Sequence, residues 1–430
     1  MQIVDYLPFV ALVGLVAVLL IFPRVGLAKP AVVAALLALA ALPDHIGTII
    51  GKVGPSLLGV LIMMSAVQLA VSMIMDERGA DWLGDVLGAP LRSARLSNVP
   101  ASVLVPGMLM PLAMVSAAMI HNIPAVALLA PITFSLCQRI GIPWVPALVG
   151  LIPASNLGGA SAAWGDTPAI IQRQIWGFDV STFALNMLPR NLVILSILIV
   201  VVAGWSYCLD RRTGNRWKQE HERLRLRDQI LARRIRSAGA TCDQFLGAGG
   251  LFGLFVAQML SPTYALAVSM AILATLLAFR TGGDFLRSTF VLGEEAVLAI
   301  AALFTISAAI EHSPLLTVIA EKLLANRNGG VEAVAFFVTS LISADGAAAM
   351  LAPVVHAKHD GSLQAAWALA SGICAGSTAL LTSASAGPIL MEAAKRSGAP
   401  FSFRTYAAFG IPFSLIMLGS YLLLSLFGWA

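Results

Sequence analysis

The sequence predicts an all-α polytopic membrane protein with two inverted-topology repeats, each with a re-entrant helical hairpin and an unwound transmembrane helix. Of its 430 residues, 58% are hydrophobic and only 11% are charged, whereas soluble domains carry about 25% charged residues. Apolar runs of about 20 residues, long enough to span a bilayer, recur along the chain. Backbone groups in lipid must pair internally, and long continuous runs favour helices over a barrel. A pair of similar motifs, one in each half, predicts the repeats.

The first half of the chain is expected to hold five spans and one Pro-interrupted apolar stretch. The spans are 7–22, 30–48, 54–75, 145–171 and 187–208, and the interrupted stretch is 98–137. The first span lacks a basic segment before it and a small-residue cleavage site after it, so we expect it to be retained.

The second half is expected to repeat this arrangement after a polar linker. Its spans are 244–261, 263–280, 291–311, 364–391 and 405–428, and its irregular stretch is 331–357. The linker, 210–243, is rich in arginine. It therefore divides the chain into an N-terminal repeat, 1–209, and a C-terminal repeat, 244–430. A cytoplasmic connection is the simplest interpretation of the linker, and binding to anionic lipid is the alternative.

Basic residues indicate the orientation of the spans. The net charge is +5 and the isoelectric point is about 9.2, but the basic residues gather in loops, so we expect no nucleic-acid partner. With the linker inside, most other basic loops also fall inside, as the positive-inside rule requires. The sparser outside loops hold Lys52, Arg173, Arg190, Lys322, Arg327 and Lys358. The two halves then have opposite orientations, as in many secondary transporters.

Similar motifs occur in the same order in both halves. In the first half, His-Asn-Ile-Pro and a run ending Leu-Ala-Pro (121–131) precede Ala-Ser-Asn-Leu-Gly-Gly (154–159) and Gly-Asp-Thr-Pro (165–168). In the second half, Asp-Gly and a run ending Leu-Ala-Pro (345–353) precede small-residue segments at 370–378 and 382–388. Each half thus combines a polar tip with a helix broken by small polar residues.

A helix broken at membrane depth frees backbone groups that need a partner. Each unpaired group costs roughly several kcal/mol. A break therefore persists only where protein, water or a bound solute forms hydrogen bonds to the freed groups. Freed carbonyls and hydroxyl or amide oxygens suit a hard cation, whereas half-helix N-termini suit an anion. The alternative is that the small residues only allow close packing of helices. Because the pattern occurs in both halves, we predict a substrate site between the two breaks.

The candidate substrate- or ion-binding residues come from the two tips and the two broken helices. They are His121, Asn122, Ser155, Asn156, Gly158, Gly159, Asp166, Thr167, Ser343, Asp345, Ser377, Thr378, Thr382 and Ser383. A sodium ion is the one cofactor-like ligand expected, with Asn122, Ser155, Asn156 and Asp345 as its ligands. The cysteines and histidines lack the spacing of a metal centre or a disulfide framework.

Three titratable residues are the main candidates for coupling, since a charge inside a membrane needs a reason. Asp166 follows the first break and would bind sodium or exchange a proton; the alternative is a residue at the membrane interface. Asp345 lies among alanines that let a partner approach closely. His121 titrates near neutral pH and would carry a proton, or simply cap the hairpin. Glu294, Glu295, Glu311 and His312 are expected at the interface.

The segment 154–171 resembles the signature of the arsenite-permease and sodium/proton-antiporter branch of the ion transporter superfamily, which is citrate transporter-like. That branch has Ala-Ser-Asn-Ile-Gly-Gly followed by Gly-Asp-Pro-Pro-Asn. Residues 122–131 are similar to its hairpin tip and 383–398 to its second-half segment. The branch's acid before the tip asparagine is His121 here, and Thr167 replaces a proline. The resemblance implies an inverted-repeat carrier, commonly a homodimer, with site residues at Asn122, Ser155, Asn156, Gly158, Gly159 and Asp166.

The sequence therefore predicts a secondary active transporter in a bacterial cytoplasmic membrane or one derived from it. Cation (sodium)/proton antiport by alternating access is the expected chemistry. The alternatives are sodium- or proton-coupled transport of a carboxylate or arsenite-like oxyanion, and a channel or non-transporting scaffold. No nucleophile–base set or cofactor motif appears, so we expect no enzyme. The expected partners are a small ion or anion, the lipid bilayer and a second copy of the chain.

Overall fold

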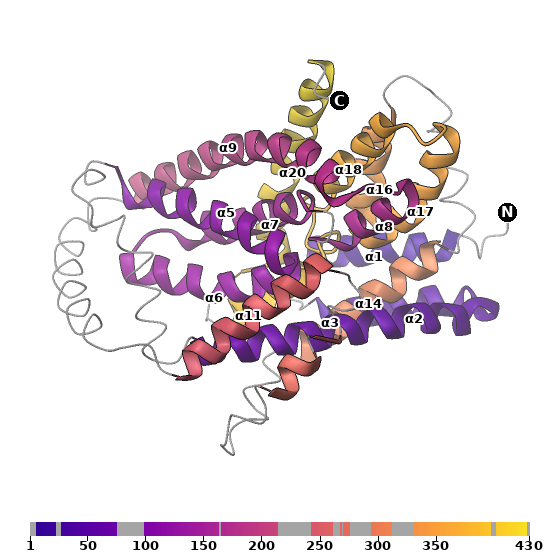
Figure 1. Ribbon diagram of the computed structural model, residues 1–430, viewed down its shortest axis with the longest axis horizontal. Coiled ribbons are helices and arrows are strands. Elements are labelled where there is room, and N and C mark those ends of the chain that lie inside the picture. Colours follow the sequence, from indigo (N-terminus) through magenta and orange to yellow (C-terminus); the bar gives the residue numbers. More distant parts are fainter. Residues whose placement is uncertain are drawn as a thin grey trace.

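A computed structural model describes residues 6–22, 27–74, 99–162, 165–213, 242–260, 267–268, 270–275, 294–311, 330–396 and 401–427. All regular structure in these ranges is helical (Figure 1), which confirms the predicted all-α class. Of the expected span 263–280, residues 267–268 and 270–275 are described and are helical, and the rest, like most of the linker 210–243, lies outside the described residues.

The N-terminal helices are α1 (Leu7–Ile21), α2 (Ala28–Ala40), the short 3-10 helix η2 (Pro43–His45) and α3 (Ile46–Ile74). The chain bends by 100° between α2 and the segment Pro43–Pro55. Pro43 lies in the first turn of η2, where the amide hydrogen that proline lacks has no helical partner. The expected spans 30–48 and 54–75 meet earlier in the chain than predicted. The boundary between the two helices is 41–45, and α3 already begins at Ile46.

The first hairpin consists of α5 (Ala101–Ile120) and α6 (Asn122–Ile140), and a single residue, His121, separates the two helices. The prolines Pro106 and Pro111 lie inside α5 and do not end it. The chain reverses instead at His121, whose φ is 77°. Few residues other than glycine adopt a positive φ, so this backbone conformation carries a local cost.

The rest of the first half is α7 (Trp144–Gly159), α8 (Thr167–Trp176) and α9 (Val180–Thr213). The second half contains α11 (Cys242–Leu260), α14 (Glu294–Glu311), α16 (Gly330–Leu341), α17 (Ala344–Lys358), α18 (Leu363–Gly376), α19 (Gly387–Arg396) and α20 (Phe403–Leu426). The helix α9 continues through Thr213, past the expected start of the linker at residue 210.

The same order of elements occurs twice. A hairpin, a helix, a non-helical break, a short helix and a long helix correspond to α5–α6, α7, α8 and α9, and again to α16–α17, α18, α19 and α20. The two broken helices do not break where the sequence suggested. Residues 155–159 and 372–376 are still helical; the described residues of the first break are 160–162 and 165–166, and the second break is 377–386. The inverted orientation of the two halves stays a prediction.

Glycines set the closest helix contacts in each half. A Cβ atom on Gly158 of α7 would overlap the carbonyl of Met114 in α5. A Cβ atom on Gly372 of α18 would overlap the carbonyl of Glu332 in α16. Backbone atoms of this kind cannot rotate away, so only glycine permits these approaches. The packing role that the sequence left open for small residues therefore applies to Gly158.

Length and composition agree with a membrane location. Helices α5, α9 (as Ser181–Arg212) and α20 are each long and apolar enough to cross a bilayer, and the bent pair α2–α3 supplies a fourth candidate. Large apolar side chains such as Val10, Leu185 and Val200 are exposed on the outer surface. In lipid, an exposed apolar side chain needs no protein cover.

Candidate functional site

The two helix breaks lie inside the protein, and the residues at their starts touch. The Nδ2 atom of Asn156, in the last turn of α7, donates to Ser377 Oγ at 2.9 Å and to Thr378 Oγ1 at 3.2 Å. Ser377 and Thr378 begin the break after α18, and all three residues are buried. The two segments that the sequence analysis paired are therefore in contact, and the substrate site between them stays a prediction.

The hydroxyls that receive Asn156 are themselves oriented by the end of α18. Ser377 Oγ donates to the Cys374 carbonyl at 2.9 Å, and Thr378 Oγ1 lies 3.4 Å from the same oxygen. A hydroxyl that donates its proton to a carbonyl keeps its lone pairs for a donor such as Asn156. The amide of Asn156 is thus fixed with its nitrogen toward these two accepting hydroxyls and its carbonyl oxygen, Oδ1, away from them.

Several buried oxygens near the breaks have no hydrogen-bond partner within the described part of the chain. They are Oδ1 of Asn156, Oδ1 of Asn122 and Oγ1 of Thr382. Burying such an oxygen without a partner costs about 1–3 kcal/mol. Amide and hydroxyl oxygens are also the ligands that hard cations take. Each of these oxygens is therefore of a chemical type that can serve as a cation ligand.

The first hairpin tip also contacts the second break. Asn122 Nδ2, at the start of α6, lies 3.5 Å from Ser385 Oγ. Ser383, in the same break, places its hydroxyl 2.8 Å from the Leu380 carbonyl and 3.2 Å from the Gly376 carbonyl. Both carbonyls also accept backbone amides, from Ala379 at Gly376 and from Ser383 and Ala384 at Leu380, so the Ser383 hydroxyl adds a further bond that holds the break in place.

Titratable side chains cluster beside the first break. Asp166 caps the N-terminus of α8 by accepting from the Thr167 amide at 3.0 Å. His121 Nε2 lies 3.8 Å from Asp166 Oδ1, and both side chains are buried. Asp345, in the first turn of α17, interacts electrostatically with Asp166. The site thus joins an acid and a histidine of the first half with an acid of the second.

The remaining predicted residues take supporting positions. Ser343 caps α17 by accepting from the Gly346 amide at 3.2 Å, and its hydroxyl lies 2.9 Å from that of Ser307. The Ser155 hydroxyl donates to the Ile152 carbonyl of its own helix at 2.9 Å. A Cβ atom on Gly159 would lie 3.0 Å from the Cβ of Asp166, so this glycine lets the chain return to the end of α7.

A second buried polar cluster, around Arg190 and Glu332, was not predicted from the sequence. Arg190 was expected in an outside loop, but it lies inside α9 and is 3% exposed. That expectation is wrong because α9 begins at Val180, ten residues before the arginine. Arg190 interacts electrostatically with Glu332 of α16, which is also buried and accepts from Ser425 Oγ at 2.7 Å. Each charge can remain buried because it has an opposite charge nearby.

Ser385, Asn191, Tyr406 and Tyr421 were also missed, although they contact the breaks or their partners. Ser385 lies in the small-residue segment 382–388, whereas only a position inside apolar runs distinguishes the other three in the sequence. The side chains of Glu294, Glu295 and Glu311 and the residue His312 lie outside the described part of the chain.

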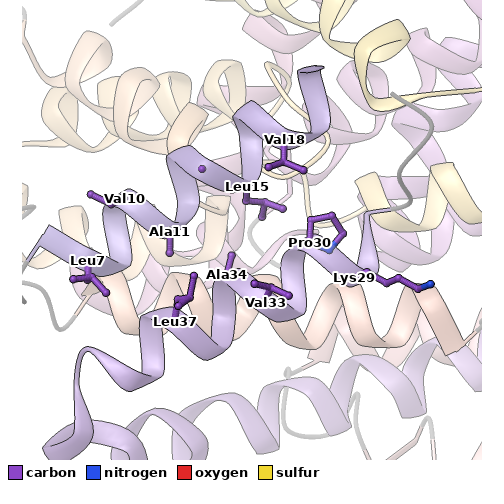
Figure 2. A pocket seen from close by; sticks show the side chains of 11 residues that line it. Leu7, Val10, Ala11, Leu15, Val18, Lys29, Pro30, Val33, Ala34 and Leu37 are labelled. Atoms are coloured by element: carbon purple, nitrogen blue, oxygen red, sulfur yellow. The ribbon is translucent and has the colours of Figure 1, made fainter. Parts of the chain in front are cut away.

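An apolar groove of about 580 Å³ lies between α1 and α2 (Figure 2). Leu7, Val10, Leu15, Val33 and Leu37 line it, with Lys29 at one end. None of the candidate site residues lines it, and it offers one charged group and almost no other polar atoms. The groove is therefore unsuited to a small ion, in contrast to the polar region between the breaks.

Residues 7–288 match the family described as citrate transporter, CitMHS. The chain belongs to this family. A curated relative, "Magnetosome protein MamN" of Paramagnetospirillum magneticum, is 29% identical over 69% of this chain and 72% of its own length. A "46 kDa membrane protein" of Mycobacterium leprae is 28% identical over 70% and 72%.

Among solved structures, the YdaH transporter of Alcanivorax borkumensis matches 97% of both chains with 16% identity and a TM-score of 0.43. The family assignment, together with the apolar helices, makes the protein an integral membrane transporter of the citrate transporter family. It also confirms the resemblance to the ion transporter superfamily.

Proposed function

We propose that the protein is a secondary active transporter that exchanges a monovalent cation, first of all sodium, for protons by alternating access. The observation that carries this proposal is the contact between Asn156 and the Ser377–Thr378 pair. It brings the ends of two helices from opposite halves of the chain together in a buried place. A small rotation of one half against the other would open or close that contact, as alternating access requires.

The ligand set favours a cation. Oδ1 of Asn156 and Oδ1 of Asn122 are buried oxygens without a partner in the described part of the chain. Two carboxyl groups, Asp166 and Asp345, interact nearby. A positive ion would pair these groups at once, whereas an anion would meet two like charges.

The carboxyl pair also supplies a coupling mechanism. Two neighbouring carboxylates in a buried site need positive charge, which either a sodium ion or a proton supplies. If the site accepts one or the other, and does not cross the membrane empty, the two fluxes become coupled. His121 lies 3.8 Å from Asp166 and would relay the proton to it, because one ring nitrogen of imidazole can accept a proton while the other releases one.

A second candidate is cation-coupled transport of a carboxylate, which the citrate transporter description of the family favours. Helix α8 begins at Thr167 beside the proposed site, and the N-terminus of a helix attracts anions. In this variant a cation bound at Asp166 and Asp345 would neutralise the acids before the carboxylate enters. The relatives that the chain matches are bacterial, and we propose a bacterial cytoplasmic membrane, or one derived from it, as the host membrane.

The test is a flux assay in proteoliposomes with an imposed proton gradient. We expect sodium or lithium, but not choline, to dissipate the gradient between pH 6 and 9. Asp166→Asn should abolish this exchange. Asp179→Asn is the matched control, because Asp179 also receives a backbone amide at a helix start but is exposed.

If no cation dissipates the gradient while labelled citrate or another carboxylate accumulates, the second candidate replaces the first. If Asp166→Asn retains the exchange rate of the Asp179→Asn control, the coupling role of Asp166 is wrong.

A further inference from the structure

One helix of the second half, α20, contacts the second break through the Tyr406 hydroxyl and is linked to the first break through Tyr421 and Asn191. Tyr406 lies near its start and Tyr421 near its end, and both side chains are fully buried. They are 15 positions apart, or about 22 Å along a helix axis. Buried tyrosines generally find a hydrogen-bond partner, so the identity of the two partners decides what the tyrosines do.

At the first break, the hydrogen bonds that link Tyr421 to α7 pass through Asn191 of α9. The Ser161 amide bonds to the Gly158 carbonyl at 3.0 Å, which leaves the Leu157 carbonyl without its usual backbone donor. Side chains supply the donors instead. Ser161 Oγ donates to it at 2.6 Å and Asn191 Nδ2 at 3.0 Å. The end of α7 is thus capped by an asparagine from α9.

Tyr421 fixes the orientation of that asparagine. Its hydroxyl donates to Asn191 Oδ1 at 2.5 Å, while Asn191 Nδ2 also donates to Ser161 Oγ at 2.9 Å. Both ends of the amide are therefore engaged. Cys374, Arg190 and Glu332 also interact electrostatically with Tyr421. Leu157 is the residue after Asn156, and a shift of its carbonyl would move the Asn156 amide as well.

At the second break, the contact is direct. The Tyr406 hydroxyl donates to the Thr378 carbonyl at 2.8 Å, and the Thr378 hydroxyl accepts from Asn156. Gly410, one turn later in α20, allows the close approach. A Cβ atom there would lie 2.8 Å from the Ala379 carbonyl and 3.0 Å from the Thr378 carbonyl. The same helix therefore touches the backbone of this break at two points.

We propose that Tyr406 and Tyr421, the latter through Asn191, are positioning residues that hold both helix breaks in the geometry that binds the transported cation. The inference rests on the proposed function for the identity of the ligand. It adds that α20, which supplies none of the ligands, sets the affinity of the site for the cation.

The test compares Tyr406→Phe, Tyr421→Phe and the double variant with Tyr207→Phe, which keeps the ring that faces Arg211. Hydrogen–deuterium exchange should rise within residues 377–386 in Tyr406→Phe and within 157–166 in Tyr421→Phe, each without the other. The sodium concentration for half-maximal proton exchange should rise about threefold to tenfold per hydroxyl lost, with the maximal rate largely kept. Tyr207→Phe should change neither quantity.

The two measurements separate the possible failures. If the wild-type protein shows no cation-dependent exchange, the proposed function is wrong, and the transported cation with it. If the wild type is active but both phenylalanine variants keep its sodium affinity and its local deuterium uptake, the positioning role is wrong. An equal rise in uptake along the whole chain would also overturn it, because that result indicates general destabilisation.

Discussion

The nitrogen and the oxygen of the Asn156 side-chain amide have different surroundings. One end, Nδ2, joins the two halves of the chain, and the other, Oδ1, lacks a hydrogen-bond partner among the described residues. A buried oxygen of this kind weakens the fold unless something binds it. The stability that a transporter sacrifices at such a position is consistent with a ligand that is present for only part of the cycle.

Replacing Asn156 with leucine tests this division. Asn156→Leu keeps a similar side-chain volume but removes both the link and the free oxygen. We expect sodium-dependent proton exchange in proteoliposomes to fall by about tenfold or more, because contacts to a charged ligand contribute roughly 1.5–3 kcal/mol. Asn186→Leu is the control, since Asn186 bonds only to Thr182 in its own helix. Equal activity of the two variants would contradict the role of Asn156.

Asp179 supplies a test of pH dependence outside the membrane. Hydrogen bonds from Thr182 and then Ser181 hold the pKa of Asp179 below its ordinary value. Its ionised form therefore stabilises the start of α9 above the ordinary pKa, about 4, and the contribution is lost as pH falls through the lowered pKa. Thermal unfolding between pH 7 and 3 should show a smaller acid-induced decrease in Asp179→Asn than in the wild type. An unchanged decrease would contradict it.

At the level of elements, each half contains two helices that pack so closely that only glycine fits at their contact. The pairs are α5 with α7 and α16 with α18, and their contacts lie at Gly158 and Gly372. Gly158 lies within one turn of a helix break and Gly372 within two turns. Close packing and helix interruption, which the sequence presented as alternatives, therefore occur side by side.

Alanine substitutions at these glycines should destabilise the protein. Gly158→Ala and Gly372→Ala force a methyl group against a backbone carbonyl, so the helices must separate. We expect a loss of about 1–3 kcal/mol, as overpacked cores show, seen as a lower unfolding temperature in detergent. Gly14→Ala in α1 is the control, because no atom lies within 4 Å of its added Cβ. Unfolding temperatures equal to that control would show that the contacts are not as close as described.

The sequence predicted the elements better than their ends. Apolar runs located most helices to within a few residues, and the small-residue motifs located the two breaks to within about one turn. The breaks lie just after Gly159 and Gly376 because tertiary contacts, not local propensity, complete the last helical turns. Asn156 and Asp166 were accessible through their motif. Asn191, Tyr406 and Tyr421 were not, because their partners lie 28 to 230 residues away in the chain.

For the whole molecule, the main open prediction is that the two halves face opposite ways. Gln138 lies near the end of α6 and Gln364 near the start of α18, and both are exposed. Each is next to the loop that follows a hairpin. In a background without the four native cysteines, Gln138→Cys should react with an impermeant maleimide only from the cytoplasmic side. Gln364→Cys should react only from the other side. Labelling of both from one side would contradict the inverted arrangement.

The central claim is that a cation binds where the two breaks meet. Crystals of the protein soaked in thallium(I), a monovalent ion that mimics alkali cations and scatters anomalously, would test it most directly. We predict an anomalous peak within coordination distance of Asn156 and beside Asp166, which excess sodium removes and Asn156→Leu lacks. A peak elsewhere in the protein, or no peak at saturating thallium, would contradict the claim.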